Sequence, residues 1–388
     1  MPSFIQNLLS NRTARGYLTQ LIVLLGVAWL GWMMFDNVAT NLRQQNIASG
    51  LSFLEEEAGF GISQTLVEYS EQSSYGQALW VGLLNTLLCA LLGIFFASIF
   101  GFSIGVARLS PNWLVAKLAA TYVDLLRNVP LLLQIFFWYF AVLRSLPGPE
   151  ASFELADSFF MNTRGIFVPS LVMEGYGGLV AGCMVLGAVF GWLVAHALEK
   201  RHAVRPIWLG KTMLAPGVGL VFGLFATLIF VGVPAVDYPH LDGFNFVGGL
   251  GIIPEFTALT LALSLYTAAF IAEIVRAGIQ SVDRGQVEAS QALGLSSRQE
   301  LKLVVIPQAL RVIIPPLTSQ YLNLTKNSSL AVAIGYPDLV SVFSGTVLNQ
   351  TGQAVEVIAI TMAVYLILSL STSFLMNIYN ARMQLVTR

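Results

Sequence analysis

The chain has 388 residues, of which 56% are hydrophobic and only 11% are charged, with 20 Lys and Arg residues against 21 Asp and Glu residues. Its mean hydropathy is +0.72, whereas a soluble domain usually carries about 25% charged residues. So few charges cannot cover the surface of a soluble protein of this length, and the composition predicts an integral membrane protein. The near-zero net charge argues against nucleic acid binding, and two cysteines cannot form a disulfide framework.

Stretches without charge locate the predicted spans, because about 20 apolar residues cross the hydrocarbon as a helix. The five long stretches lie between Arg15 and Asp36, Glu71 and Arg108, Glu174 and Glu199, Lys211 and Asp237, and Glu356 and Arg382. The three shorter stretches lie between Arg127 and Arg144, Glu255 and Glu273, and Arg311 and Lys326. A short stretch can span only if its charges lie at helix ends or along a protein-lined path. The sequence therefore predicts an all-α integral membrane protein with about eight transmembrane helices.

The first span, near residues 17–35, has two interpretations. Arg12 and Arg15 precede its apolar run, which is also the pattern of a signal peptide. The run is followed by Phe35-Asp36-Asn37 and not by a clear small-x-small cleavage site, so an uncleaved anchor helix is favoured. An acidic outer loop is predicted after it, over residues 36–78.

The distribution of charge predicts the orientation, because Lys and Arg collect in cytoplasmic loops. With the N-terminus inside, the basic residues of the outer loops are only Arg43, Arg144, Arg164 and Lys326. The acidic residues collect on the outer side, as in the run at residues 55–57. Both termini are therefore predicted to be cytoplasmic.

The most informative segment covers residues 284–309, which read RGQVEASQALGLSSRQELKLVVIPQA. A run of good helix formers ends at Gly294, a predicted C-cap, and Ser296 or Ser297 can cap a second helix in which Glu300 is suitably placed. One interpretation is an amphipathic helix at the membrane interface. The other is a short protruding helix that docks into another protein. Its apolar contact ridge would consist of Ala289, Ala292, Leu293 and Leu295.

Three motifs resemble one known family. Glu288-Ala289-Ser290, followed by Gly294 and by Ile306-Pro307, resembles the EAA loop of ABC importer permeases, with Ser290 in place of the second Ala. Residues 266–279 (YTAAFIAEIVRAGI) and 306–311 (IPQALR) look like the polar amino-acid permeases of the histidine/glutamine type. Residues 124–134 (DLLRNVPLLLQ) match the same family, although Asn128 and Val129 replace its Gly and Thr.

The resemblance implies a type I ABC importer permease core of five helices, at about residues 80–107, 115–143, 255–279, 304–326 and 354–379. The layout resembles the larger permease subunits of general L-amino-acid systems or of glutamate/glutamine/aspartate/asparagine systems. It divides the chain into an anchor helix with an acidic periplasmic loop (1–75), the first two core helices (76–145), an insertion with two extra helices (146–245), and the last three core helices with the coupling loop (246–388).

The resemblance also implies that the 284–309 segment couples the chain to an ATPase subunit. The residues that match this role are Glu288, Ala289, Ser290, Ala292, Leu293, Gly294 and Pro307.

Polar residues inside predicted spans suggest a substrate pathway, because such residues line a cavity or pair with other helices. Gln308, Arg311, Ser319, Asn323 and Lys326 have spacings compatible with one helix face, in a helix interrupted by prolines. Residues that could bind or gate a zwitterionic substrate are Arg127, Asn128, Gln134, Thr267 and Glu273. The alternative for Asp124 with Arg127, and for Glu273 with Arg276, is a simple ion pair on a helix surface.

No phosphate-binding loop is present, because Gly210-Lys211-Thr212 lacks the required earlier glycine and has Arg205 there. The chain is therefore predicted not to hydrolyse ATP itself. Because no His, Cys or acidic cluster has catalytic or metal-ligand spacing, the chain is also predicted not to be an enzyme and to hold no metal or cofactor. The resemblance implies that ATP and Mg belong to a partner ATPase dimer, and that a second related permease and a periplasmic amino-acid-binding protein are further partners. The composition predicts contact with membrane lipid and none with nucleic acid. The alternative is a secondary amino-acid transporter. It is disfavoured because no internal repeat stands out and Asp124 and Glu273 are the only candidate acids within the membrane.

Overall fold

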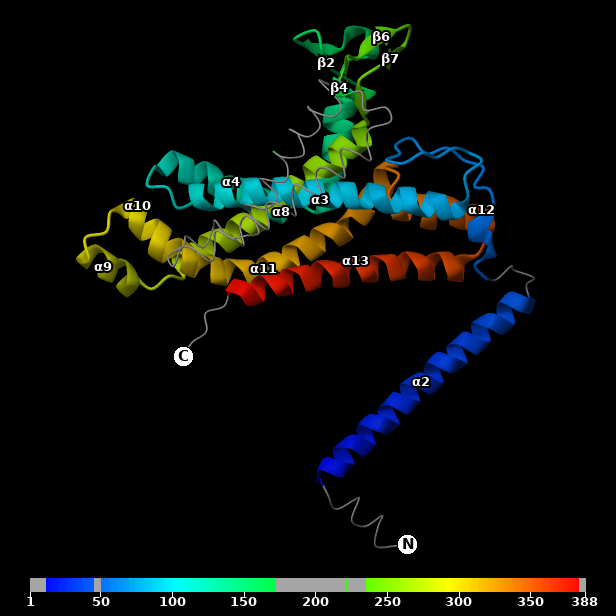
Figure 1. The fold of residues 1–388 in the computed structure, drawn as a ribbon, viewed down its shortest axis with the longest axis horizontal. Helices are drawn as coiled ribbons and strands as arrows, with labels where there is room; N and C mark the ends of the chain where they lie inside the picture. The colour runs from blue at the N-terminus through cyan, green and yellow to red at the C-terminus, as the bar shows by residue number, and fades with distance from the viewer. Residues whose placement is uncertain (1–11, 45–49, 172–220, 222–234, 384–388) are drawn as a thin grey trace, which may run out of the picture.

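The computed structural model describes residues 12–44, 50–171, 221 and 235–383. Helices dominate these residues, which confirms the prediction of a helical membrane protein (Figure 1). The long helices are α2 (Arg12–Gln44), α3 (Tyr75–Ala107), α4 (Trp113–Asn128), α8 (Pro254–Gln280), α11 (Ile306–Asn327) and α13 (Ala354–Met383). Shorter helices are α5 (Leu131–Phe136), α9 (Arg284–Ala292), α10 (Ser297–Glu300) and α12 (Leu348–Thr351).

Within the described residues, five helices are long and apolar enough to cross a membrane, or up to six if a bent pair forms one span. They correspond to the anchor helix and the five core helices expected from the sequence. The two spans predicted between Glu174 and Glu199 and between Lys211 and Asp237 lie almost entirely outside the described residues.

The second core span, predicted as one helix over residues 115–143, is broken. α4 and the helical stretch Leu131–Ser145 meet at an angle of 106°. The break falls at Val129, whose backbone is extended with φ −100° and ψ 128°, directly before Pro130. The proline ring disfavours the helical conformation at the preceding residue, so a straight helix does not pass this point. The stretch after α5 continues as η2 (Phe137–Val142) and η3 (Leu143–Ser145).

Close packing of small residues holds α3 against α8. A Cβ atom at Gly105 would lie 2.7 Å from the Cβ of Val275 and 2.8 Å from the carbonyl oxygen of Ala272. A Cβ atom at Gly101 would lie 2.5 Å from the Cβ of Ile271. Only glycine permits this approach of two helix backbones, as is common for helices that pack in a membrane.

Replacing Gly105 by alanine is expected to destabilise the protein by about 1–3 kcal/mol, because the added methyl group forces α3 away from α8. Gly31→Ala, in the open part of α2, is the matched control, since a Cβ atom at this position would meet nothing within 4 Å. Both changes improve helix propensity, so only the steric contact distinguishes them. Thermal unfolding of the purified protein in detergent measures the effect, and equal midpoints for the two variants would contradict it.

α11 begins directly after the π-helical segment η6 (Leu301–Val305) and continues through Pro315 and Pro316 without ending. It is followed by η7 (Ser328–Ile334) and η8 (Val340–Val347), and the chain then returns along α13. α8 packs against α3, α11 and α4, and 67% of its most apolar 18-residue stretch is buried. The core of the protein is therefore centred on α8.

A β module, here meaning residues 153–171 and 236–252, lies in the predicted insertion and extends past its predicted end at residue 245, although no strand was expected from the sequence. Its four-stranded antiparallel sheet has the order β1 (Phe153–Leu155), β2 (Phe159–Asn162), β3 (Gly165–Val168), β8 (Leu250–Ile252). Two small two-stranded sheets pair β4 (Ser170–Leu171) with β5 (Val236–Asp237), and β6 (His240–Asp242) with β7 (Asn245–Val247). The two residues between β6 and β7 are Gly243 and Phe244, and glycine at the first turn position, with φ +58°, was the available local signal for a hairpin.

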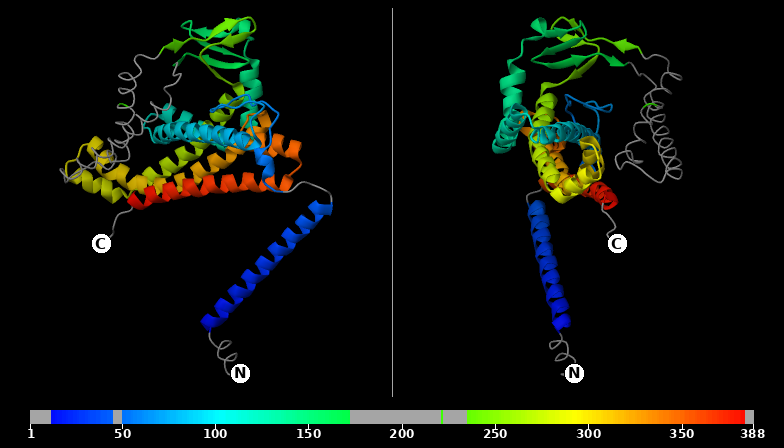
Figure 2. Two further views of the ribbon diagram at one scale, coloured as in Figure 1. Left: turned by 45° about the vertical axis from the view of Figure 1, so that its right-hand side comes forward. Right: turned by 90° about the vertical axis from the view of Figure 1, so that its left-hand side faces the viewer.

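The β module lies beyond the N-terminal end of α8, and α9 and α10 lie at the opposite end of that helix (Figure 1 and Figure 2). α2 lies apart from the other helices, and its described side chains are exposed. It runs to Gln44, beyond the predicted end of the anchor near residue 35. Part of the predicted acidic loop, residues 50–74, packs Phe53 and Ala58 against Phe343 and neighbouring apolar residues at the N-terminal end of α3.

Candidate functional site

The 284–309 segment forms two short helices joined by a tight turn. The Asp283 carboxylate accepts a hydrogen bond from the Gly285 N–H and so caps the start of α9. α9 ends at Gly294, as predicted, where φ is +76°. The Gly294 N–H donates to the Gln291 carbonyl (2.9 Å), and the Leu295 N–H donates to the Ser290 carbonyl (3.2 Å). These are the two hydrogen bonds of a Schellman ending, which requires a left-handed residue at this position.

The second helix, α10, starts at Ser296, whose N–H donates to Gln299 Oε1 at 2.9 Å. The expected partner of this cap, Glu300, has another contact instead. Its carboxylate accepts hydrogen bonds from Ser290 Oγ (3.3 Å) and Gln291 Nε2 (3.0 Å). Glu300 thereby fixes α10 against α9, and the buried Ser290 hydroxyl is part of that contact.

The residues assigned to the coupling role divide into exposed and internal ones. Ser290 is buried and Pro307, in the first turn of α11, is half-buried. Exposed residues are Glu288, Ala289, Ala292, Leu293 and Gly294. Leu293 stands out because 81% of its surface is exposed, and covering a leucine contributes about 1.5–3 kcal/mol. This short helix, at one end of the molecule, presents a surface suited to a protein partner.

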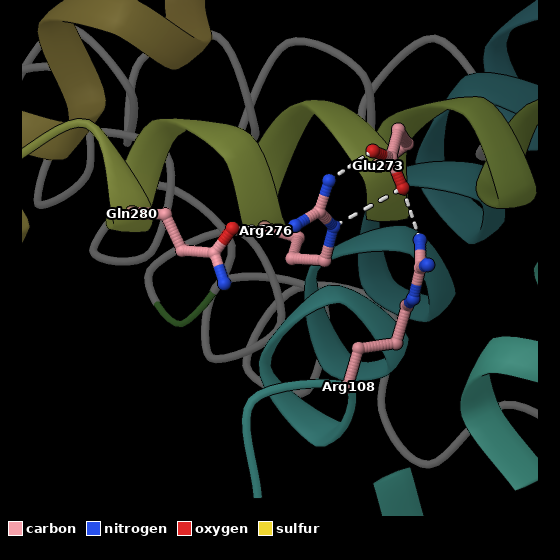
Figure 3. Close-up of polar contacts among 4 residues, drawn as sticks. All are labelled: Arg108, Glu273, Arg276 and Gln280. Carbon is pink, nitrogen blue, oxygen red and sulfur yellow. Dashed lines mark hydrogen bonds and ion pairs between the residues drawn. The ribbon is translucent and has the colours of Figure 1, made fainter. Parts of the chain in front are cut away.

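A charged cluster, defined as Arg108, Glu273, Arg276 and Gln280, links α3 to α8 (Figure 3). The Glu273 carboxylate accepts hydrogen bonds from Arg276, through Nη2 and Nε, and from Arg108 Nη1. Arg276 Nη1 also donates to Gln280 Oε1. The pair of Glu273 with Arg276 was an alternative expected from the sequence, whereas the contact from Arg108 was missed, because 165 residues separate it from Glu273.

The predicted pathway residues near the bend between α4 and α5 have mainly structural contacts. Gln134 is 5% exposed, and its Nε2 donates to the carbonyl oxygens of Leu126 and Val129, both at 2.9 Å. It satisfies carbonyl groups that the break leaves without helical partners. Asn128 Nδ2 donates to the Asp124 carbonyl at 2.7 Å. The Cζ atom of Arg127 lies 5.1 Å from the centre of the Phe270 ring, and no ion pair with Asp124 is among the described contacts of Arg127.

The remaining pathway candidates lie at different depths. Thr267 is buried within α8. Gln308 Nε2 donates to Gln286 Oε1 on α9 at 3.4 Å, so it lies beside the 284–309 segment. Arg311 is half-buried in α11, and Ser319 and Asn323 are exposed on the same helix. The described part of the chain does not gather the predicted pathway residues at one place, and their roles stay predictions.

A groove of about 420 Å³ lies between the end of α11 and α13. Its lining combines one cation and three hydroxyl groups with two apolar side chains: Lys326, Ser329, Val340, Tyr365, Leu366 and Ser369. Of these residues, only Lys326 was expected from the sequence. Tyr365 and Ser369, four residues apart in a hydrophobic helix, share one helix face, and this spacing was the available signal.

A buried acid lies behind this groove, in the turn between η7 and η8. Asp338 is fully buried, and its Oδ1 accepts a hydrogen bond from the Ser341 N–H (2.9 Å) while its Oδ2 accepts one from the Tyr365 hydroxyl (3.3 Å). Asp338 lies between the two last candidate spans, which end at Ile334 and begin at Ala354. Burial raises the pKa of the Asp338 carboxyl from 3.8 to about 7, although these hydrogen bonds act in the opposite direction. This acid was missed at the level of sequence, where only Asp124 and Glu273 were singled out.

Asp338→Asn is expected to be more stable than the unchanged protein at pH 8 and about equally stable at pH 4. The folded state holds the Asp338 proton more tightly than the unfolded chain, so stability falls as the pH rises from about 4 to about 7. The amide cannot ionise and therefore avoids this loss. Thermal unfolding across this pH range measures it. Asp242→Asn, at an exposed acid, is the control, and a constant difference between Asp338→Asn and the unchanged protein at all pH values would contradict the expectation.

Known proteins resemble this chain in sequence. The model of the family described as "Binding-protein-dependent transport system inner membrane component" matches residues 91–385. The putative amino-acid ABC transporter permease protein YhdX of Escherichia coli K12 is 52% identical over 98% of this chain and 96% of its own length. The general L-amino acid transport system permease protein AapQ of Rhizobium johnstonii is 50% identical, over 95% of this chain and 91% of its own. The glutamate/glutamine/aspartate/asparagine transport system permease protein BztB of Rhodobacter capsulatus is 41% identical, over 95% and 93%.

Together with the helical membrane core and the protruding 284–309 segment, these similarities identify a transport permease, a class distinct from the secondary transporter considered as the alternative. The chain belongs to the family of binding-protein-dependent transport system inner membrane components. The resemblance to ABC importer permeases of amino-acid systems is thereby confirmed, and the chain is a multi-pass inner-membrane protein.

Proposed function

We propose that this chain is one permease subunit of an ATP-driven importer that carries polar L-amino acids from a periplasmic binding protein into the cytoplasm by alternating access. The observation that carries the proposal is the exposed surface at the end of α9, where the Leu293 side chain is available to contact a partner protein. The names of two relatives support the substrate class. AapQ is named for general L-amino acid transport, and BztB for transport of glutamate, glutamine, aspartate and asparagine.

The work of transport comes from a separate ATPase dimer, which binds ATP and Mg, while this chain hydrolyses nothing. α9 inserts into a groove on the ATPase, and Glu288 meets basic groups there. The side that carries α9 is therefore cytoplasmic, as are both termini, and the β module is periplasmic. This orientation agrees with the predominance of Lys and Arg in the loops predicted to be cytoplasmic.

A second, related permease completes the pathway. Ser319, Asn323 and Lys326 are exposed along α11, within a helix long and apolar enough to span the membrane. Polar groups in that position are costly against lipid and instead face protein or a water-filled path. A sister subunit against this face of α11 would cover them, and the resemblance to the larger permease subunits of two-permease systems favours a heterodimer with a related permease.

The groove between α11 and α13 is the best candidate for substrate contact. The Lys326 ammonium can pair with the α-carboxylate of an amino acid, and the hydroxyl oxygens of Ser329, Tyr365 and Ser369 can accept hydrogen bonds from its ammonium group. Val340 and Leu366 supply an apolar wall. This arrangement suits small zwitterions with polar side chains.

Reconstitution in lipid vesicles tests the proposal. The chain is purified together with its ATPase, the sister permease and the binding protein, and uptake of labelled glutamine and glutamate is measured. The expected result is uptake that requires ATP inside, binding protein outside and an intact catalytic residue in the ATPase. Uptake that an ion gradient alone drives, or purification of the chain without an ATPase, would overturn it.

A further inference from the structure

The charged cluster lies at the junction between the membrane core and the 284–309 segment. α8 ends at Gln280, and α9 begins at Arg284, so only three residues separate them. The Ser281 N–H donates to the Ala277 carbonyl (2.9 Å), the Ser281 hydroxyl donates to the Gly278 carbonyl (2.7 Å), and Asp283 caps α9. α9 is therefore attached to the end of α8 by a short connection with its own hydrogen bonds.

The cluster begins at α3 and ends beside this connection. Arg108 is the residue that ends α3, and its Nη1 donates to Glu273 Oε2 on α8. Arg276 holds both oxygens of the same carboxylate, and Gln280, one turn further, accepts from Arg276. Two guanidinium groups on one carboxylate leave the cluster with one net positive charge.

The contact from Arg108 is a charge-assisted hydrogen bond, whereas the rest of α3 packs against α8 through apolar contacts. Gly101 and Gly105 pack against Ile271 and Val275 by van der Waals contact, which does not depend on one particular pair of polar atoms. A charge-assisted hydrogen bond fixes a particular pair of atoms. Arg108 and Glu273 therefore set the axial position of α3 relative to α8 at the end nearest α9.

We propose that Arg108 and Glu273 are positioning residues for energy coupling: their ion pair makes α3 and α8 move as one body when the ATPase displaces α9. The inference rests on the proposed function. Arg276 orients the Glu273 carboxylate but does not itself reach α3, so its role is to support the pair. Without the bond between Arg108 and Glu273, movement of α9 turns α8 while α3 lags, and ATP is hydrolysed with less transport.

The first test removes the link between the helices but leaves the pair within α8 intact. Arg108→Gln is compared with Arg108→Lys and with Lys117→Gln, a change at an exposed cation of α4. The number of ATP molecules hydrolysed per amino acid imported is measured in vesicles. Arg108→Gln is expected to raise this ratio about tenfold, because one charge-assisted hydrogen bond is lost. Substrate-stimulated ATPase activity is expected to stay within about twofold of that of the unchanged protein. Arg108→Lys restores most of the coupling, and Lys117→Gln leaves it unchanged.

The second test replaces the ion pair by a covalent link. Arg108→Cys/Glu273→Cys is made in a chain whose Cys89 and Cys183 are replaced by serine. The reduced protein is expected to be uncoupled, and a short thiol-specific cross-linker is expected to restore the coupling ratio to within about twofold of the starting protein. If cross-linking instead stops transport, the pair is a gate that must open, and the inference is overturned.

A normal coupling ratio in Arg108→Gln also overturns it. Should Arg108→Gln fail to assemble, the comparison between reduced and cross-linked cysteine pairs decides alone. The unchanged complex, measured in the same vesicles, separates the two levels of the proposal. If it shows no ATP-driven uptake, the proposed function fails, whereas ATP-driven uptake with normal coupling in the variants overturns only the role of Arg108 and Glu273.

Discussion

Gly294→Pro is expected to reduce amino-acid import roughly a hundredfold while the chain still inserts into the membrane and pairs with its sister permease. The φ of Gly294 is +76°, whereas proline fixes φ near −65°. Proline also removes the N–H that donates to the Gln291 carbonyl. The turn between α9 and α10 then cannot form, at a cost of about 3 kcal/mol, and α9 no longer presents Leu293 to the ATPase. Import and substrate-stimulated ATPase activity in vesicles measure the effect.

The matched control is Gly294→Asn, because asparagine tolerates the left-handed conformation and keeps the N–H. It is expected to retain most of the import activity. Glu288→Arg reverses a charge on the exposed face of α9 without touching the turn, and we expect it to uncouple ATP hydrolysis from import. Normal substrate-stimulated ATPase activity in Gly294→Pro would show that the segment is not the contact with the ATPase.

Lys326→Met is expected to lower import about ten- to a hundredfold by removing the cation that pairs with the substrate carboxylate. Methionine keeps the length and most of the volume of the side chain, so the groove between α11 and α13 retains its shape. The loss is expected in transport, while assembly with the ATPase and its basal activity persist. Initial rates of uptake across a range of substrate concentrations provide the measurement.

Ser329→Ala, one turn along from Lys326, is the companion variant. This variant loses one neutral hydrogen-bonding group and no charge, so its import is expected to fall by only about threefold to tenfold. Uptake kinetics of Lys326→Met equal to those of the unchanged protein would exclude the groove as the substrate site, and the pathway would then have to be sought among the residues at the bend, such as Arg127.

Features fixed by local sequence were predictable. Long apolar stretches located α3, α8 and α13, and the caps around Gly294 and Ser296 located α9 and α10, because these signals lie within a few residues of the structure they determine. The break at Pro130 also had a local signal, since a proline disfavours a helical residue before it. The prediction of one helix over residues 115–143 followed from the resemblance to a five-helix core and did not use this signal.

Features that depend on the tertiary arrangement were not predictable. Arg108 reaches Glu273 only because Gly101 and Gly105 bring α3 against α8. Asp338 is buried because α3, η8 and α13 meet around it, and nothing in its immediate neighbours distinguishes it from a loop acid. The strands of the β module are only two to four residues long, too short for an alternating pattern to stand out from the apolar background.

The pairing of β3 with β8 also bears on how such a chain can change over generations. Ile166 lies opposite Ile252, so the polypeptide leaves the core and returns to it at neighbouring positions. Because these two ends already meet, lengthening the chain between them costs little loop-closure entropy, since each doubling of a flexible loop adds only about 0.6 kcal/mol. The permease core therefore tolerates addition or loss of sequence between these two strands, and this position is a natural point for grafting foreign domains onto the transporter.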